Sequence, residues 1–237
     1  MPQGYSYVLD QKSFAEQLNV FRTHRRCGQL TPIVTFDDGH SSDYDVAFPL
    51  LMEKGMTAHF FITAGWMEKR HGYMKWDQVR ELHAAGHSIG AHGFTHKLFT
   101  HCDGKGLQYE LVSARKLLED KLGAPVTTLS FPGGRFNKRI LSACQDAGYV
   151  KMFTSIPRVE TLPTRNIIGR LNVRGDWTLS FITRLLDPES GVLQRLERQE
   201  KLKALAKTIL GDALYGWIWA IANRKGSGEN QPVDRSL

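Results

Sequence analysis

Residues 47–63 read AFPLLMEKGMTAHFFIT, a helical pattern that ends at Gly55 and is followed by a short apolar run. A glycine in this place can adopt the left-handed conformation that commonly ends a helix. The run after it is rich in Phe, Ile and Thr, as buried strands are. The stretch therefore predicts a helix, a tight turn and a strand.

The same pattern recurs along the chain. WDQVRELHAAG precedes HSIGAH, LVSARKLLEDKLG precedes APVTTLSF, and ILSACQDAG precedes YVKMFTS, with Gly86, Gly123 and Gly148 at the expected helix ends. TPIVTF at 31–36 and RNIIGRLNV at 165–173 indicate two more strands. Strands and helices that alternate in this way favour an α/β fold, in which helices pack outside a parallel sheet.

Length, charge and cysteine content indicate what kind of protein this is. The chain has 237 residues, enough for one sizeable domain, and a net charge of +7. The three cysteines, Cys27, Cys102 and Cys144, are odd in number and scattered, which fits neither a disulfide framework nor a cysteine zinc site. The sequence begins with no secretory pattern and contains no long apolar run. We expect a cytoplasmic protein that binds no nucleic acid, since it carries no motif for that purpose.

The C-terminal third differs from the rest. Residues 165–225 contain 11 Lys and Arg against 6 Asp and Glu, which places +5 of the net charge there. Apolar residues at helical spacing predict an amphipathic helical extension over 193–225, after a main domain at 1–192. That helix can cover the domain, join a second copy in a homo-oligomer, or lie peripherally on the inner face of a membrane. Residues 226–237 are typical of a disordered tail.

Two adjacent acids, Asp37 and Asp38, stand at the end of the first predicted strand, before Gly39. In parallel α/β folds the chemistry gathers at the carboxyl ends of the strands. Because successive strand residues point to opposite faces, the two carboxylates can face different ways. One can then serve a substrate and the other a cation.

A second polar cluster, HSIGAHGFTH, contains His92 and His96. On a helical turn after the strand, this i, i+4 pair would present both imidazoles on one face. Together with a carboxylate at the same edge, the pair predicts a site for one divalent ion, Zn²⁺ first, with Co²⁺, Mn²⁺ and Fe²⁺ as alternatives. The competing interpretation is that both histidines are hydrogen-bonded structural residues.

A third element, LSFPGGRFN at 129–137, follows another predicted strand. The turn Pro132–Gly133–Gly134 lets the backbone approach a ligand closely and aim N–H groups at it. A backbone donor beside a metal would form an oxyanion hole. Taken alone, such a sequence is usually only a turn.

TFDDG, HGFTH and FPGGRFN, in this order, resemble the polysaccharide deacetylase family with the NodB homology domain, carbohydrate esterase family 4. The resemblance covers about residues 30–175 and extends to the flanking stretches AFPLLMEKGMTAHFFIT and WDQVRELHAAGHSIGAH. It implies a distorted (β/α) barrel. It also implies a metal-dependent hydrolase that removes acetyl groups from N-acetylated sugars.

The resemblance also implies a role for each motif residue. Asp37 would be the general base, and Asp38, His92 and His96 would hold the metal. The backbone N–H of Gly133 would help to hold the oxyanion, at a position where the family often has a tyrosine. The candidate substrate contacts are Pro132, Gly134 and, further along the chain, Trp177.

The chain departs from the family pattern at two points. Ser130 stands where the family usually has an arginine that orients the base, and Arg135 is the candidate replacement. The late histidine that acts as general acid in many members is absent, since the last histidine here is His101. Losing a general acid typically costs 10²–10⁴-fold in rate. His40, His101 or the protonated Asp37 are the candidates to protonate the leaving amine.

Three functions stay open at this point. The first is a deacetylase acting on an N-acetylated polysaccharide precursor, on a lipid-linked sugar or on a small glycan. The second is hydrolysis of a C–N bond in a cyclic amide on the same scaffold. The third is a non-catalytic protein that binds metal and sugar, which the missing histidine and Ser130 would explain.

Overall fold

The computed structural model describes residues 9–26, 32–158, 166–200 and 202. Two compact units divide the chain, Met1–Gln194 and Arg195–Leu237. The predicted C-terminal helix beyond residue 202 and the predicted tail at 226–237 lie outside the described residues. The first unit carries all the elements named below.

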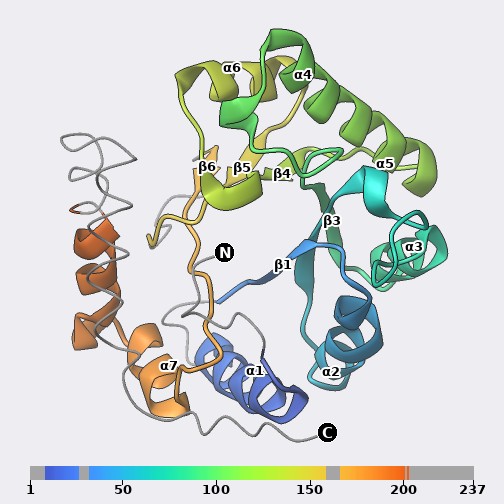
Figure 1. Ribbon diagram of the computed structural model, residues 1–237. Coiled ribbons are helices and arrows are strands. Elements are labelled where there is room, and N and C mark those ends of the chain that lie inside the picture. Colours follow the sequence, from blue (N-terminus) through green and yellow to red (C-terminus); the bar gives the residue numbers. More distant parts are fainter. Residues whose placement is uncertain (1–8, 27–31, 159–165, 201, 203–237) are drawn as a thin grey trace, which may run out of the picture. The chain divides into compact units, whose positions relative to one another are not determined.

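In the described part of this unit, six strands form one parallel sheet, which is curled (Figure 1). They are β1 (Val34–Asp38), β2 (Ala58–Ile62), β3 (Ser88–Ala91), β4 (Thr128–Ser130), β5 (Lys151–Phe153) and β6 (Ile167–Ile168). The strands lie side by side in sequence order, and every neighbouring pair is parallel. The predicted α/β fold of the distorted-barrel type is confirmed.

Helices follow the strands and surround the sheet (Figure 1). They are α1 (Gln11–Arg26), α2 (Phe48–Glu53), α3 (Trp76–Ala84), α4 (Gly104–Gln108), α5 (Ala114–Leu122), α6 (Lys138–Asp146) and α7 (Leu179–Leu186). Two π-helical turns, η1 (Asp43–Ala47) and η4 (Tyr109–Ser113), run into α2 and α5. Short 3₁₀ turns are η2 (Ala64–Trp66), η3 (Phe99–His101), η5 (Pro132–Gly134) and η6 (Pro188–Ser190). The four glycines predicted to end helices all have φ between 62° and 89°.

The core lies between the sheet and its helices. Phe60 and Ile62 of β2 join Leu51 of α2 and Leu118 of α5 in one buried cluster. Phe61, on the opposite face of the same strand, packs on a Phe ring of β5. β2 is buried on both faces, and its sequence is apolar except for the half-buried His59, as is typical of parallel sheets.

No helix in the described part of the chain is long and apolar enough to cross a membrane. The predicted strands are longer than the observed ones. RNIIGRLNV, for example, pairs only through Ile167–Ile168. β1 starts at Val34 and extends through both aspartates.

Candidate active site

Three predicted ligand side chains meet at the carboxyl edge of the sheet. Asp38 ends β1, and the loop that carries His92 and His96 follows β3. Asp38 pairs with Ile62 and Ile62 with Ala91, so the two chain segments leave the sheet at the same level. Nε2 of His92 lies 3.5 Å from Oδ1 of Asp38, and Nε2 of His96 lies 3.2 Å from the same oxygen.

This cluster fits a divalent cation. One ligand atom from each residue lies within 4.8 Å of the others. Two ligand atoms at about 2.1 Å from a tetrahedral ion are about 3.4 Å apart, close to the separations of 3.5 and 3.2 Å. Oδ1 of Asp38 is buried and has no hydrogen-bond partner among the described residues. Such an atom is costly unless a bound group compensates for it.

Both imidazoles are held in the form that binds a cation. Nδ1 of the buried His92 lies 2.9 Å from the carbonyl oxygen of Ser130. Since a carbonyl can only accept, Nδ1 carries the proton, and the lone pair of Nε2 is left for the cation. Burial lowers the pKa of His96, and the neighbouring His92 lowers it further. The neutral form of the His96 ring is therefore favoured.

The two histidines do not lie on a helical turn, so that part of the prediction is wrong. Gly93 and His96 have φ values of +75° and +63°, outside the right-handed helical region. The backbone N–H groups of the loop therefore need partners other than the carbonyls of a helix. A single carboxylate supplies them.

Glu110, in the π-helical turn η4, supplies this carboxylate and is buried. Its Oε2 accepts the backbone N–H of Phe94 at 2.7 Å and that of Thr95 at 2.9 Å. Its Oε1 accepts the Thr95 hydroxyl. A Cβ on Gly93 would lie 2.9 Å from Oε2, so the loop needs a glycine there. Glu110 thus fixes the backbone that presents His96.

Asp37 has different partners from its neighbour Asp38. The guanidinium of Arg170 donates to both carboxylate oxygens, from Nη1 to Oδ1 at 2.8 Å and from Nη2 to Oδ2 at 2.9 Å. The Ser130 hydroxyl donates to Oδ2 at 3.1 Å and accepts from Arg170 Nη2 at 2.6 Å. The two adjacent acids are therefore divided, as the alternation along a strand predicted.

Arg170 is itself firmly held. Its side chain is 9% exposed, and it donates to the Thr154 carbonyl at 3.1 Å and to the Thr35 hydroxyl at 3.0 Å. Burial alone would raise the pKa of Asp37. The hydrogen bonds and the positive charge of Arg170, with the hydrogen bond from Ser130, oppose that effect, and the pKa of Asp37 lies below its usual value. Asp37 is therefore ionised at neutral pH and can accept a proton.

A family model described as polysaccharide deacetylase matches residues 28–152, more than half of the chain. The chain belongs to the polysaccharide deacetylase family.

Two curated members of the family show how far the likeness extends. YxkH of Bacillus subtilis (strain 168), whose name places it among the polysaccharide deacetylases, is 30% identical over 125 residues, or 53% of this chain and 44% of YxkH. A chitooligosaccharide deacetylase of Azorhizobium caulinodans is 30% identical over 143 residues, or 56% of this chain and 66% of that protein. This chain thus spans less than two thirds of either relative.

A solved structure shares the fold. The Streptococcus pyogenes deacetylase PplD, solved in complex with acetate, superposes with a TM-score of 0.67 at 18% sequence identity. The match covers 76% of this chain and 88% of PplD. The curled parallel sheet described above is therefore the polysaccharide deacetylase fold.

The arginine that the family pattern places at Ser130 is supplied from elsewhere in the chain. Arg170, two residues after β6, reaches Asp37, and the Ser130 hydroxyl lies between them. The expected replacement, Arg135, is exposed and is not the arginine that bonds Asp37. Sequence reasoning missed Arg170 because it lies inside RNIIGRLNV, which the sequence predicts as one strand. The observed strand ends at Ile168, so Arg170 lies beyond it, at the functional edge of the sheet.

The turn Pro132–Gly133–Gly134 lies beside the histidine loop. Gly133 and Gly134 have φ values of +64° and +67°. A Cβ on Gly133 would lie 2.6 Å from Cδ2 of Leu98, two residues after His96. The oxyanion contact from Gly133 and the substrate contacts of Pro132 and Gly134 remain predictions.

The remaining candidates are His40, His101 and Trp177. His40 is exposed, and its ring packs edge-on against Tyr73 at 5.7 Å. His101 is exposed at the end of η3. Trp177 is half-buried and packs on Phe181 at 4.8 Å. The contacts described place none of these rings against the ligand cluster, so their roles remain predictions.

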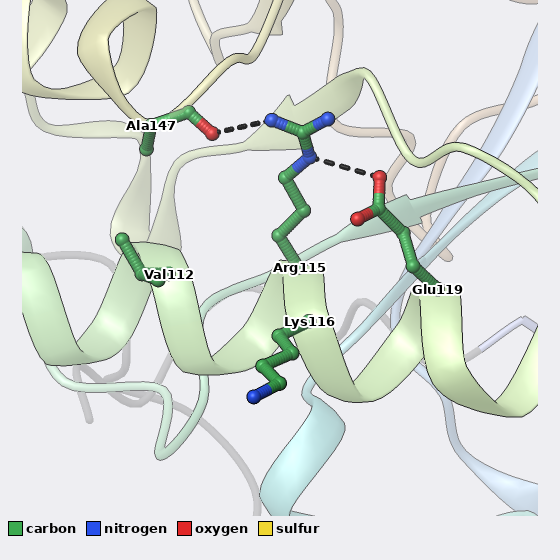
Figure 2. A pocket seen from close by; sticks show the side chains of 5 residues that line it. All are labelled: Val112, Arg115, Lys116, Glu119 and Ala147. Atoms are coloured by element: carbon green, nitrogen blue, oxygen red, sulfur yellow. Dashed lines mark hydrogen bonds and ion pairs between the residues drawn. The ribbon is translucent and has the colours of Figure 1, made fainter.

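A shallow hollow over η4 and α5 has no part in this site (Figure 2). It is lined by Val112, Arg115, Lys116, Glu119 and Ala147. Arg115 donates to the Ala147 carbonyl at 2.7 Å and to Glu119 at 2.9 Å, so these polar groups satisfy one another. We assign no ligand to this hollow.

Proposed function

We propose that this protein is a metal-dependent hydrolase that removes the acetyl group from an N-acetylated sugar. The observation that carries the proposal is the carboxylate of Asp37, bonded at both oxygens by Arg170, beside the cluster of Asp38, His92 and His96. One carboxylate is suited to moving a proton and the other to holding a cation. Membership of the polysaccharide deacetylase family supports the same reaction.

Asp38, His92 and His96 would hold the divalent ion, with Zn²⁺ first among the candidates. When bound, such an ion would polarise the acetyl carbonyl and lower the pKa of a water molecule. Asp37 accepts the proton of the water whose oxygen attacks the carbonyl carbon. As the C–N bond breaks, the leaving nitrogen takes a proton that Asp37 can return. The products are acetate and a free amine.

The substrate class is proposed from the relatives and from the charge of the chain. One relative is a chitooligosaccharide deacetylase, which supports an oligomer of an N-acetylated amino sugar. We further propose that the substrate is a cytoplasmic glycan precursor, and the basic C-terminal sequence supports a lipid-linked one at an anionic membrane face. Flotation with anionic vesicles tests the membrane part. Equal flotation of the full chain and a chain ending before Leu202 would remove that part alone.

The reaction is tested by measuring acetate release from N-acetylglucosamine oligomers. The protein is first stripped of metal and then supplied with Zn²⁺, Co²⁺ or Mn²⁺. We expect turnover that depends on the added ion and that Asp37→Asn abolishes, while the variant retains its metal. A protein that binds metal but releases acetate from no N-acetyl sugar would contradict the proposal.

A further inference from the structure

The segment between β2 and α3, residues 63–75, forms a wall beside the ligand cluster; we call it the rim loop. Ala64 and Gly65 donate their N–H groups to the carbonyls of Gly93 and Phe94, at 3.2 and 2.9 Å. A Cβ on Gly65 would lie 2.5 Å from the Phe94 oxygen, so this close approach requires glycine. The start of the rim loop is therefore fixed to the loop that carries His96.

The end of the rim loop is fixed to the aspartate segment. Met74 donates its N–H to the Gly39 carbonyl at 3.0 Å, and Ser41 donates to the Gly72 carbonyl at 2.8 Å. The rim loop thus joins the segment after Asp38 to the segment before His96. Its side chains have a defined position relative to the proposed reaction centre.

Three of these side chains, Trp66, Arg70 and Tyr73, are in contact beside the ligand cluster, with the two rings edge to face; we call this group the stack. The Trp66 ring lies 5.2 Å from the His96 ring, and the Tyr73 ring lies 4.8 Å from Trp66. The guanidinium carbon of Arg70 lies 4.2 Å from the centre of the Trp66 ring and 5.1 Å from that of Tyr73. Two cation–π contacts hold the charge of Arg70 in place on the rim.

The guanidinium of Arg70 is held on the rim and is accessible to a ligand. The residue is exposed, and its guanidinium makes no ion pair or hydrogen bond with any described residue. Lys69, next to Arg70 in the sequence, and Lys97, next to His96, are also exposed and add positive charge. An arginine stacked on rings keeps its in-plane N–H donors free for a planar or tetrahedral anion. Less side-chain entropy is lost on binding when the cation is already ordered.

We propose that the stack of Trp66, Arg70 and Tyr73 is a substrate subsite that takes an anionic group carried by the glycan, a phosphate or a carboxylate. The proposal rests on the deacetylase function proposed above and specifies its substrate class. Arg70 lies no farther from His96 than the span of one or two sugar rings, because Trp66 alone separates them. The anion would therefore sit on a unit next to the one that loses its acetyl group.

The test compares three N-acetylglucosamine oligomers of equal length: a neutral one, one with a phosphate at its reducing end, and one with a uronic acid there. Dissociation constants are measured with metal-loaded protein in an Asp37→Asn background, where no turnover occurs. kcat/KM is measured with otherwise wild-type protein. Arg70→Gln is the test variant. Lys69→Gln is the matched control, since it removes one charge from the same loop without touching the stack.

We expect Arg70→Gln to weaken binding of an anionic oligomer about tenfold and to raise its KM similarly. This is the effect of losing one charge-assisted hydrogen bond. Binding of the neutral oligomer should stay within about twofold, and Lys69→Gln should behave like the parent. The oligomer that responds identifies the anion as phosphate or carboxylate. Equal losses for neutral and anionic oligomers, or equal effects of the two variants, would overturn the subsite.

The two proposals fail in different ways. Anion-selective binding that depends on Arg70, without acetate release from any oligomer, would leave the subsite standing and remove the deacetylase. Acetate release with no dependence on Arg70 would do the reverse. If the wild-type protein neither binds nor cleaves any of the three oligomers, both proposals fail.

Discussion

Arg170, just beyond the last strand, donates one hydrogen bond to each carboxylate oxygen of Asp37 in the first strand, at 2.8 and 2.9 Å. The pair spans 133 residues of sequence and connects the two edges of the curled sheet. A planar fork on a carboxylate fixes both its position and its orientation. The curl of the sheet therefore brings Arg170 to Asp37, and Arg170 aligns the carboxylate of the proposed base.

Replacing Arg170 should impair the reaction without removing the metal. A charged hydrogen bond contributes about 1.5–3 kcal/mol, so Arg170→Lys, which cannot form the fork, should lower kcat/KM about tenfold to a hundredfold. Because Arg170 lowers the pKa of Asp37, the acidic limb of the pH–rate profile should move to higher pH. An unshifted limb would mean that Arg170 has only a structural role.

Glu110 should control metal affinity through the loop that it holds. Glu110→Ala leaves the N–H groups of Phe94 and Thr95 without their partner, and loss of such support typically weakens metal binding 10–100-fold. Glu110→Gln, which keeps an acceptor oxygen, should recover part of the affinity. Zn²⁺ titration and the Co²⁺ absorption spectrum measure the effect.

Glu119→Ala is the matched control for this experiment. Glu119 also accepts a backbone N–H, that of Val126 at 2.9 Å, but it belongs to α5 and none of its partners is a site residue. Its loss should lower thermal stability and leave the metal affinity unchanged. If both alanine variants weaken Zn²⁺ binding equally, Glu110 has no specific effect on the site.

Asp43 should give the metal-free protein a pH-dependent stability. Its carboxyl group is buried in η1, and burial raises its pKa to about 8, with the charges of Asp38 and Asp37 adding to the increase. Between the unfolded value of 3.8 and about 8, the folded chain keeps a proton that the unfolded chain has lost. The stabilisation is therefore complete below 3.8 and is lost as the pH rises to about 8.

The comparison with Asp43→Asn isolates this effect. Asparagine has the shape of the protonated acid and does not titrate, so the variant should lack this part of the decline. Relative to the variant, the wild type should lose up to about 1.4 kcal/mol per pH unit. Urea denaturation at several pH values measures the difference. Parallel pH profiles for the two proteins would show that Asp43 ionises normally in the fold.

The fold could be predicted from the sequence because its signals are local. Gly55, Gly86, Gly123 and Gly148 each mark a helix end, and the apolar runs after them are the strands. Sequence reasoning missed α1, although Phe14, Leu18 and Phe21 recur there at helical spacing and pack on the core.

The ligand cluster could be predicted, but the groups that support it could not. Asp38 ends one strand and His92 follows another that ends at the same edge, and this position is visible in the sequence. Arg170 reaches Asp37 only because the sheet curls, a property of the whole fold. His96 lies on a loop and not on the expected helical turn, and Glu110 accepts the backbone N–H groups of that loop. These contacts form only when the chain has packed, so the sequence does not show them.

The central claim is that Asp38, His92 and His96 together hold one divalent cation beside a separate base, Asp37. The most direct measurement is the metal content of purified protein by elemental analysis, for the wild type and for Asp38→Ala and Asp37→Asn. We predict about one divalent ion per chain in the wild type and in Asp37→Asn, and almost none in Asp38→Ala. Equal metal content in all three proteins, or no bound metal after Zn²⁺ is supplied to the folded wild type, would contradict the account.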